Sequence, residues 1–171
     1  MTLDGFVIQP VERHARLAAI PSGADAEWRL GGGRNEVVII GHRTFEQVCA
    51  GKHDWPYVGM STVVRGSTSV SNQVPEYLRE EKIELAALSP ERLLIELGGR
   101  GIQQVVIDGV QASQEFLEWG GADVVALTHF PVLIGEGLPL FGVLQRNVRL
   151  VHLRTESFSA GVVQSRYAVK Q

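Results

Sequence analysis

The chain has 171 residues, of which 44% are hydrophobic and 20% are charged, a composition typical of one ordinary globular domain. A net charge of −3 without any basic run argues against nucleic acid or a membrane surface as the main partner. The single cysteine, Cys49, leaves no disulfide framework and no cysteine-based metal site. We expect one domain over residues 1–171, in the cytoplasm, without a signal peptide or a membrane-spanning segment.

Short apolar runs that end at turn residues predict strands in the first half of the chain. Residues 36–40 are apolar and β-branched after Glu36, which is typical of a buried strand. Thr44 is expected to cap a short helix that ends at Val48 or Cys49. A second strand is expected over residues 57–64, closed by the turn sequence RGSTS.

Helices and strands alternate in the second half. Ser89-Pro90 predicts a helix start, with a capping hydroxyl followed by proline at the first helical position, and Gly98-Gly99 predicts its end. The apolar face of this helix consists of Leu93, Leu94 and Leu97. The further elements that we expect are a strand over 104–107, a helix over 112–119, a long strand over 123–134 and two final strands over 148–154 and 161–169.

Strands that alternate with helices predict an α/β fold with a mainly parallel sheet covered on both faces. The last two strands have no helix between them, so they predict an antiparallel hairpin at one edge. Ligands of such sheets bind beyond the carboxyl ends of the strands. Three loops at those ends therefore deserve analysis: GHRT at 41–44, RGSTS at 65–69 and DGVQ at 108–111.

The first two loops have the residue types that bind phosphate. Gly41 permits a turn, Thr44 is a cap, and His42 and Arg43 place positive charge near the start of a helix. Arg65 and three hydroxyls follow the next strand. Each loop is equally compatible with an ordinary structural role, as a capped helix with surface His and Arg or as a glycine turn.

The third loop raises a question about its fit to a dinucleotide. Asp108 either binds the amino or hydroxyl groups of a ligand or caps the turn that follows. Gly109 precedes a helix start, a common place for a pyrophosphate, but Val110 stands where such loops often have a second glycine. A β-branched residue resists positive φ and crowds an approaching phosphate.

Two more acidic residues are candidates for substrate contacts. Asp4 and Gly5 predict a tight turn, in which Asp4 binds local N–H groups, Gly5 has positive φ and the turn covers a ligand. Glu27 lies beside Trp28 and is either a buried acid with a raised pKa or a surface residue next to a core tryptophan. The histidines show no metal-binding spacing, so we expect no metal site.

Motifs along nearly the whole chain resemble those of the dihydrofolate reductase superfamily. They are TLDGF, GHRTFE, VVRGSTS, VVIDGVQASQEFL, THFPVLIGEGLPLF and SFSAGVVQSRY. The most similar branch is the C-terminal reductase domain of the bacterial riboflavin-biosynthesis deaminase-reductase. The resemblance implies a three-layer αβα fold with a mixed, mainly parallel sheet of about eight strands and a C-terminal antiparallel hairpin. It also implies an NADPH-dependent reductase of a pyrimidine- or pteridine-like small molecule, as in 5-amino-6-(5-phosphoribosylamino)uracil reductases, and a homodimer through the C-terminal strands.

The resemblance also implies residue roles, although it assigns no catalytic residue. The expected cofactor contacts are Gly41, His42, Arg43 and Thr44, then Arg65, Gly66 and Ser67, then Gly109, Val110 and Gln111, and finally Gly135 and Glu136. The expected substrate contacts are Asp4, Glu27 and Asp108. His42, Arg43 and Arg65 favour NADPH over NADH because they provide positive charge for a 2′-phosphate.

The chain departs from the family pattern at Val110 and at its start. Relatives carry a strand before the turn that corresponds to TLDG, whereas this sequence begins at Met1. Either the sheet lacks a central strand or the start has been placed too late. These departures keep two alternatives open, a reductase-like binding module without catalysis and a true dihydrofolate reductase.

Overall fold

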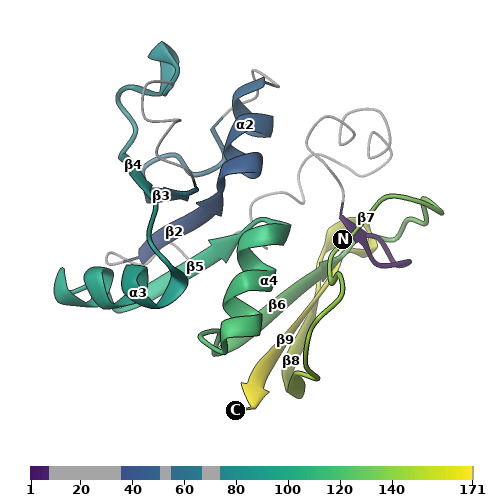
Figure 1. The fold of residues 1–171 in the computed structure, drawn as a ribbon. Helices are drawn as coiled ribbons and strands as arrows, with labels where there is room; N and C mark the ends of the chain where they lie inside the picture. The colour runs from purple at the N-terminus through teal and green to yellow at the C-terminus, as the bar shows by residue number, and fades with distance from the viewer. Residues whose placement is uncertain (8–35, 51–54, 67–73, 171) are drawn as a thin grey trace. The chain divides into compact units, whose positions relative to one another are not determined.

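The computed structural model describes residues 1–7, 36–50, 55–66 and 74–170 (Figure 1). The chain forms two compact units, one made of Gly31–Trp119 and the other of Met1–Leu30 with Gly120–Gln171. Within the described ranges, no helix is long and apolar enough to cross a membrane.

A parallel sheet of four strands forms the centre of the Gly31–Trp119 unit. Its order is β4-β3-β2-β5, with every neighbouring pair parallel. The strands are β2 (Glu36–Gly41), β3 (Ser61–Arg65), β4 (Ile83–Ala86) and β5 (Gln104–Asp108). The parallel sheet predicted from the alternation of elements is confirmed.

Helices cover both faces of this sheet, as Figure 1 shows. They are α2 (His42–Ala50), α3 (Pro90–Gly99) and α4 (Val110–Trp119), and a 3₁₀ turn spans Glu76–Leu78. Alternate residues of β2 point to opposite faces because the side-chain period of a strand is two. Val38 and Ile40 pack with Phe45 of α2, while Val37 and Ile39 pack in the cluster that contains α3 and α4 residues. The unit therefore has three layers.

The helix predicted after Ser89 is confirmed in detail. Ser89 is its N-cap, and its side chain accepts a hydrogen bond from the Arg92 backbone N–H at 3.4 Å. Leu93 and Leu97 are buried, as their spacing predicts, and the helix ends at Gly99.

Other boundaries differ from the prediction. Helix α2 begins at His42, so Thr44 lies inside the helix and is not its cap. Strand β3 begins at Ser61, because a turn with a Met60 N–H to Tyr57 carbonyl bond of 3.0 Å precedes it. Strand β4 was not predicted, since its four residues, IELA, alternate too briefly to be recognised.

Helix α4 begins at Val110, two residues before the predicted start at Ala112. Gly109 adopts a φ of +99°. Ala160 is the one non-glycine residue with positive φ in the described ranges, so Val110 does not have positive φ. Val110 is thus the first residue of the helix and needs no left-handed conformation, because Gly109 alone makes the turn. The expected strain at Val110 is absent.

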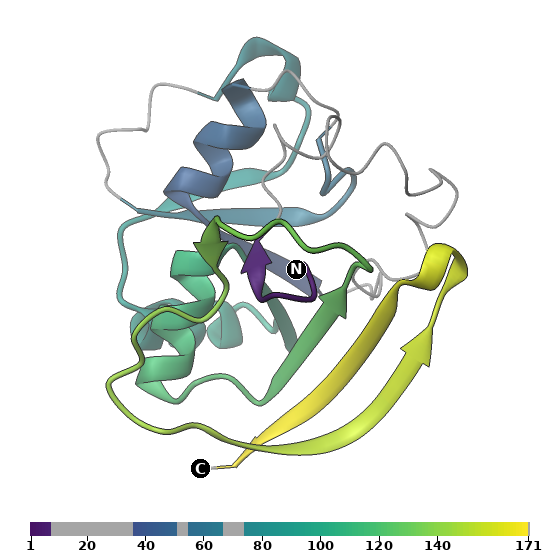
Figure 2. The same ribbon diagram turned by 90° about the vertical axis from the view of Figure 1, so that its right-hand side faces the viewer.

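The second unit contains an antiparallel sheet in the order β6-β9-β8 (Figure 2). Its strands are β6 (Val124–His129), β8 (Arg149–Ser157) and β9 (Val163–Lys170), and a 3₁₀ turn at Ser159–Gly161 joins β8 to β9. The predicted C-terminal hairpin is confirmed. The strand predicted over 123–134 ends at His129, two residues before Pro131, which cannot donate to a ladder.

The first residues of the chain run beside the end of β6. The Met1 amino group donates to the Thr128 carbonyl at 2.6 Å, and the Phe130 N–H donates to the Met1 carbonyl at 2.9 Å. Short strands β1 (Phe6–Val7) and β7 (Leu138–Pro139) form a separate antiparallel pair. The described strands thus lie in sheets of four, three and two strands. The resemblance implied a single sheet of about eight.

The tight packing of Gly109 gives a stability prediction. A Cβ atom at this position would overlap Thr44 Oγ1 and would also require an alanine at positive φ. We expect Gly109→Ala to lower the free energy of unfolding by about 2 kcal/mol or more. Gly98→Ala is the matched control, since a Cβ there meets nothing within 4 Å and helix propensity favours alanine. Urea unfolding of both variants measures the difference, and an equal effect at the two positions would contradict the packing argument.

Candidate functional site

The carboxyl ends of β2, β3 and β4 open into a cavity of about 390 Å³ in the Gly31–Trp119 unit. The register explains why, because Gly41 pairs with Arg65 and Arg65 pairs with Ala86 across the sheet. The residues that line the cavity are Gly41, His42, Arg43, Arg65, Gly66, Ala87, Leu88, Gln111, Ala112 and Glu115.

Two helices contribute their first turns to this cavity. His42 and Arg43 open α2, while Gln111 and Ala112 lie in the first turn of α4. The first turn of a helix carries backbone N–H groups without an intrahelical partner and the positive end of the helix dipole. Both ends favour an anionic ligand, so the geometry supports phosphate binding.

Arg65 is held at two points in the cavity wall. Its Nε donates to the Leu88 carbonyl at 3.1 Å, and its Nη1 forms an ion pair with Glu115. The side chain is 19% exposed, and burial lowers the pKa of Arg65 from its ordinary value. Arginine remains a cation at neutral pH even so. The site therefore contains a fixed positive charge with a carboxylate already beside it.

Two glycines allow backbone segments to approach closely around the cavity. A Cβ on Gly66 would lie 2.7 Å from the Cβ of His42, closer than real side chains come. Gly109 lies against Thr44 in the same way. Thr44 thus contributes through its contact with Gly109, and these contacts fix the loops after β3 and β5 against α2.

Asp108 is held on both of its oxygens although it remains exposed. Its Oδ2 accepts a hydrogen bond from the Tyr57 hydroxyl at 2.7 Å, and its Oδ1 accepts one from the Gly109 N–H at 2.7 Å. Tyr57 is 4% exposed and packs edge-on against Trp55, with ring centroids 5.1 Å apart. The two roles expected of Asp108, capping of the following turn and binding of a ligand, are thus compatible. Its carboxylate bonds the Gly109 N–H and still faces solvent.

In the unit made of Met1–Leu30 and Gly120–Gln171, Asp4 anchors a loop that lies far along the chain. Its Oδ2 accepts from the backbone N–H groups of Ile134 and Gly135 at 3.0 and 2.8 Å. These two contacts span about 130 residues of sequence and were not predicted. The predicted local bonding is present as well, since Asp4 also bonds the Thr2 side chain and its own backbone N–H. The positive φ of Gly5, +88°, is confirmed.

The structure brings only part of the predicted set together. Six of the predicted residues line one cavity: Gly41, His42, Arg43, Arg65, Gly66 and Gln111. Thr44, Asp108, Gly109 and Val110 adjoin them, while Asp4, Gly135 and Glu136 belong to the other unit. Glu27 and Ser67 lie outside the described residues.

Four residues that line the cavity were not predicted from the sequence: Ala87, Leu88, Ala112 and Glu115. Tyr57, which bonds Asp108, was assigned to a strand. Leu88 acts through its carbonyl, which no side-chain pattern reveals. Glu115 follows Gln111 by four residues, and this spacing places both on one face of a helix. That spacing was the available signal for Glu115.

Cys49 fits its expected role as a packed residue. Its side chain is half-buried against the cluster of α2, Trp55 and Tyr57, and burial raises the pKa of its thiol. A thiol with a raised pKa is a poor nucleophile at neutral pH. In the described part of the chain, no group of three or more His, Cys, Asp or Glu side chains is arranged to hold a metal ion.

The family model for the RibD C-terminal domain matches residues 25–164 of the chain. A solved structure assigned to riboflavin biosynthesis in Shewanella sp. PV-4 is 25% identical, with a TM-score of 0.80 and coverage of 100% of this chain and 96% of that one. None of the curated proteins matches the sequence significantly.

Two other solved structures share the fold at lower identity. One is the diaminohydroxyphosphoribosylaminopyrimidine deaminase/5-amino-6-(5-phosphoribosylamino)uracil reductase of Thermotoga maritima, at 18% identity and a TM-score of 0.65, with 99% of this chain and 54% of that one covered. The other is dihydrofolate reductase from Enterococcus faecalis complexed with NADP(H), at 19% identity and a TM-score of 0.54, with 80% of this chain and 76% of that one covered.

The Asp4 anchor gives a local prediction with a pH dependence. A hydrogen bond from Thr2 and the Gly135 and Ile134 N–H groups lower the pKa of Asp4. A lowered pKa means that the anchor is complete above the ordinary aspartate pKa and is lost as pH falls through the lowered one. We expect Asp4→Asn to speed amide hydrogen exchange at these two N–H groups at pH 7. Unchanged exchange there, measured by NMR, would show that the carboxylate does not anchor the loop.

Proposed function

Because the chain belongs to the RibD C-terminal domain family, we propose that it is an NADPH-dependent reductase. The proposed reaction is hydride transfer to a pyrimidine- or pteridine-like substrate, of the 5-amino-6-(5-phosphoribosylamino)uracil reductase type. The observation that carries the proposal is the cavity at the ends of β2, β3 and β4, where two helix starts and Arg65 meet.

The residues of this cavity fit a nucleotide with phosphate groups. The first turns of α2 and α4 offer backbone N–H groups, and Arg43 and Arg65 offer cationic side chains. Gly66 and Gly109 keep the surrounding loops close to α2. In the Enterococcus faecalis enzyme, which shares the fold, NADP(H) is the bound dinucleotide.

Hydride transfer requires mainly that the protein position the cofactor and the substrate. NADPH supplies the hydride when it is bound, so no nucleophile or metal is required of the chain. The proposed role of Asp108 is to accept hydrogen bonds from the amino or hydroxyl groups of the substrate. Tyr57 holds the carboxylate in place for this role, because a fixed acceptor loses little entropy on binding.

The alternative of a binding module without catalysis has lost part of its support. It rested on Val110 and on the departure at the start of the chain. Val110 has a helical position and no positive φ, so backbone strain does not oppose a dinucleotide there. A true dihydrofolate reductase remains the other alternative. Turnover of dihydrofolate, compared with turnover of a ribosylaminouracil, distinguishes it from the proposed reductase.

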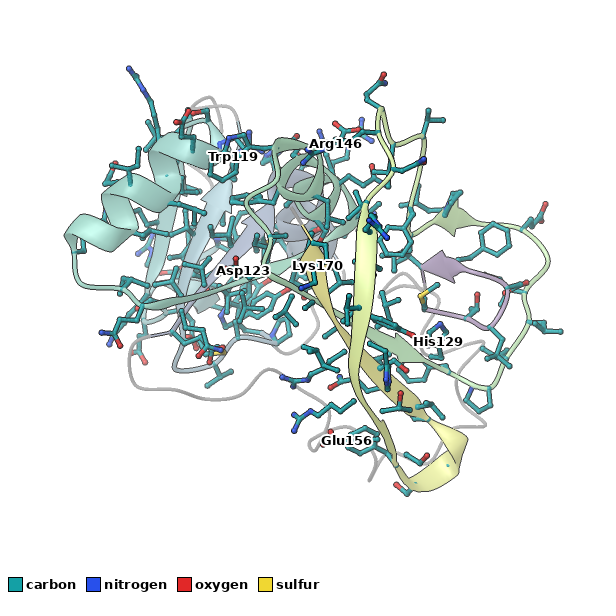
Figure 3. All side chains as sticks on the ribbon, turned by 90° about the horizontal axis from the view of Figure 1, so that it is seen from below. Trp119, Asp123, His129, Arg146, Glu156 and Lys170 are labelled. Atoms are coloured by element: carbon teal, nitrogen blue, oxygen red, sulfur yellow. The ribbon has the colours of Figure 1, made fainter. Side chains whose placement is uncertain are left out.

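We also propose that two copies associate through β8. All nine residues of this strand are exposed, and they include Leu150, Val151 and Leu153. Among the described strands β8 pairs on one side only, with β9, and its other edge is open to a second chain. The register of β8 with β9 shifts between His152 and Arg154, which divides this edge into two segments. Figure 3 shows Glu156 near the turn of this hairpin and Lys170 at its opposite end.

The charges on β8 suit a second copy of the same strand. Arg149 and Glu156 stand near opposite ends of the strand, and both are exposed. In the antiparallel register whose two-fold axis passes between His152 and Leu153, Arg149 of one copy lies opposite Glu156 of the other, which favours a closed dimer. Glu156 also pairs with Arg154 of its own strand, at 3.3 Å.

The function is tested by binding and by turnover. We expect the protein to bind NADPH, followed by quenching of tryptophan fluorescence, and to oxidise NADPH with a ribosylaminouracil substrate but not with dihydrofolate. Asp108→Asn is expected to lower kcat/KM about tenfold or more while the affinity for NADPH stays unchanged. Asp123→Asn, which changes an exposed carboxylate in the other unit, is the control.

The outcomes distinguish the proposed reductase from its two alternatives. NADPH binding without turnover of either substrate would favour the binding module. Turnover of dihydrofolate would favour a true dihydrofolate reductase. Loss of NADPH affinity in Asp108→Asn would remove the substrate role of Asp108.

Light scattering at micromolar concentration tests the dimer. We expect a dimer for the unaltered chain and a monomer for Leu153→Glu, since a charge at the strand edge opposes pairing. Val143→Glu is the matched control, because Val143 is 88% exposed and lies outside the strands. A monomeric unaltered chain would end the proposal.

A further inference from the structure

A carboxylate occupies the cavity that we assign to nucleotide phosphate. Glu115 of α4 forms an ion pair with Arg65, and both side chains line the same cavity. Gln111 Nε2 lies 3.5 Å from the second oxygen of Glu115, one helical turn earlier. The side chain of Glu115 is 34% exposed, although its Oε2, which faces Arg65, is itself buried. An anion that binds Arg65 has to share this cation with a resident negative charge.

Arg65 does not depend on Glu115 for its position. Its Nε is bound to the Leu88 carbonyl at 3.1 Å, and its side chain is more deeply buried than that of Glu115. Nor does α4 depend on Glu115 for burial, because the buried residues of this helix are Ala112, Phe116 and Leu117. The carboxylate is therefore separable from the fold of the site, and its effect falls on the charge of the cavity.

Arg65 and Glu115 are residue types that recognise two different forms of the ribose in a nucleotide. Arginine binds a 2′-phosphate, whereas Asp or Glu accepts a hydrogen bond from an unphosphorylated ribose hydroxyl. A second anion close to the phosphate position also repels it, and burial strengthens that repulsion. Arg65 and Glu115 should thus act on the affinity for a phosphorylated ribose in opposite directions.

We propose that Glu115 competes with the phosphate of the ligand for Arg65 and is the residue that limits the preference for NADPH over NADH. This inference rests on the proposed function, since it takes the cavity as the nucleotide site. Binding of a phosphorylated nucleotide then requires Arg65 to exchange one anionic partner for another. An unphosphorylated nucleotide leaves the ion pair in place.

The test measures dissociation constants for NADPH, NADH and adenosine 2′,5′-bisphosphate by calorimetry. Glu115→Gln keeps the shape and one acceptor oxygen while it removes the charge and replaces the other oxygen by an NH2 donor. We expect it to tighten the two 2′-phosphorylated ligands by about three- to tenfold and to leave NADH unchanged or weaker. Arg65→Gln should move the ratio the other way, with weaker binding of the phosphorylated ligands. Glu118→Gln is the matched control, an exposed glutamate on the same helix.

The outcomes distinguish this inference from the proposed function. Tighter adenosine 2′,5′-bisphosphate in Glu115→Gln, without binding of either dinucleotide, would support the role of Glu115 and oppose the reductase. Catalysis with NADPH and equal affinities in Glu115→Gln and the unaltered protein would overturn the role of Glu115. No gain for any ligand, or the same gain in Glu118→Gln, would overturn it as well. Thermal unfolding by circular dichroism confirms that each variant is folded.

Discussion

Burial of β2 on both faces is the constraint on which the rest of the Gly31–Trp119 unit depends. Val38, Ile39 and Ile40 are each 0% exposed, so the strand cannot slip by one residue without exposing apolar groups. This fixes the register with β3 and β5 on either side. Gly41, Arg65 and Ala86 then end at the same level of the sheet, because Arg65 pairs with both of the others. The cavity lies beyond these aligned strand ends.

The same cavity combines features that attract and oppose an anion. Two helix starts and two arginines favour negative charge, and Glu115 opposes it. In contrast, Asp108 is satisfied from within the protein, by the Tyr57 hydroxyl and by the Gly109 N–H. The two carboxylates thus have different partners. Glu115 pairs with a cation, whereas Asp108 accepts hydrogen bonds from neutral donors.

The sequence allowed prediction of those parts whose cause is local. The buried strand at 36–40 and the helix capped by Ser89 depend on neighbouring residues, and the residues around Gly41 and Arg65 do share a cavity. Thr44 is not a cap, because the helix begins two residues earlier at His42, and its hydroxyl lies against Gly109, which is far along the chain. The role of Tyr57 and the distant contacts of Asp4 were missed because their cause is not local. Their partners, Asp108 and the loop at Ile134, are set by tertiary structure and leave no local pattern.

The pairing pattern of the strands also orders events in time during folding. β8 and β9 are joined by a short connection, and α3 is a single capped segment, so both can form through local contacts within the earliest steps. β2 and β5, in contrast, pair Glu36 with Gln104, and closing this long loop costs chain entropy before any contact compensates. The alignment that creates the cavity therefore belongs to the late part of folding. A chain that stops before this step would contain helices and a hairpin but not the cavity.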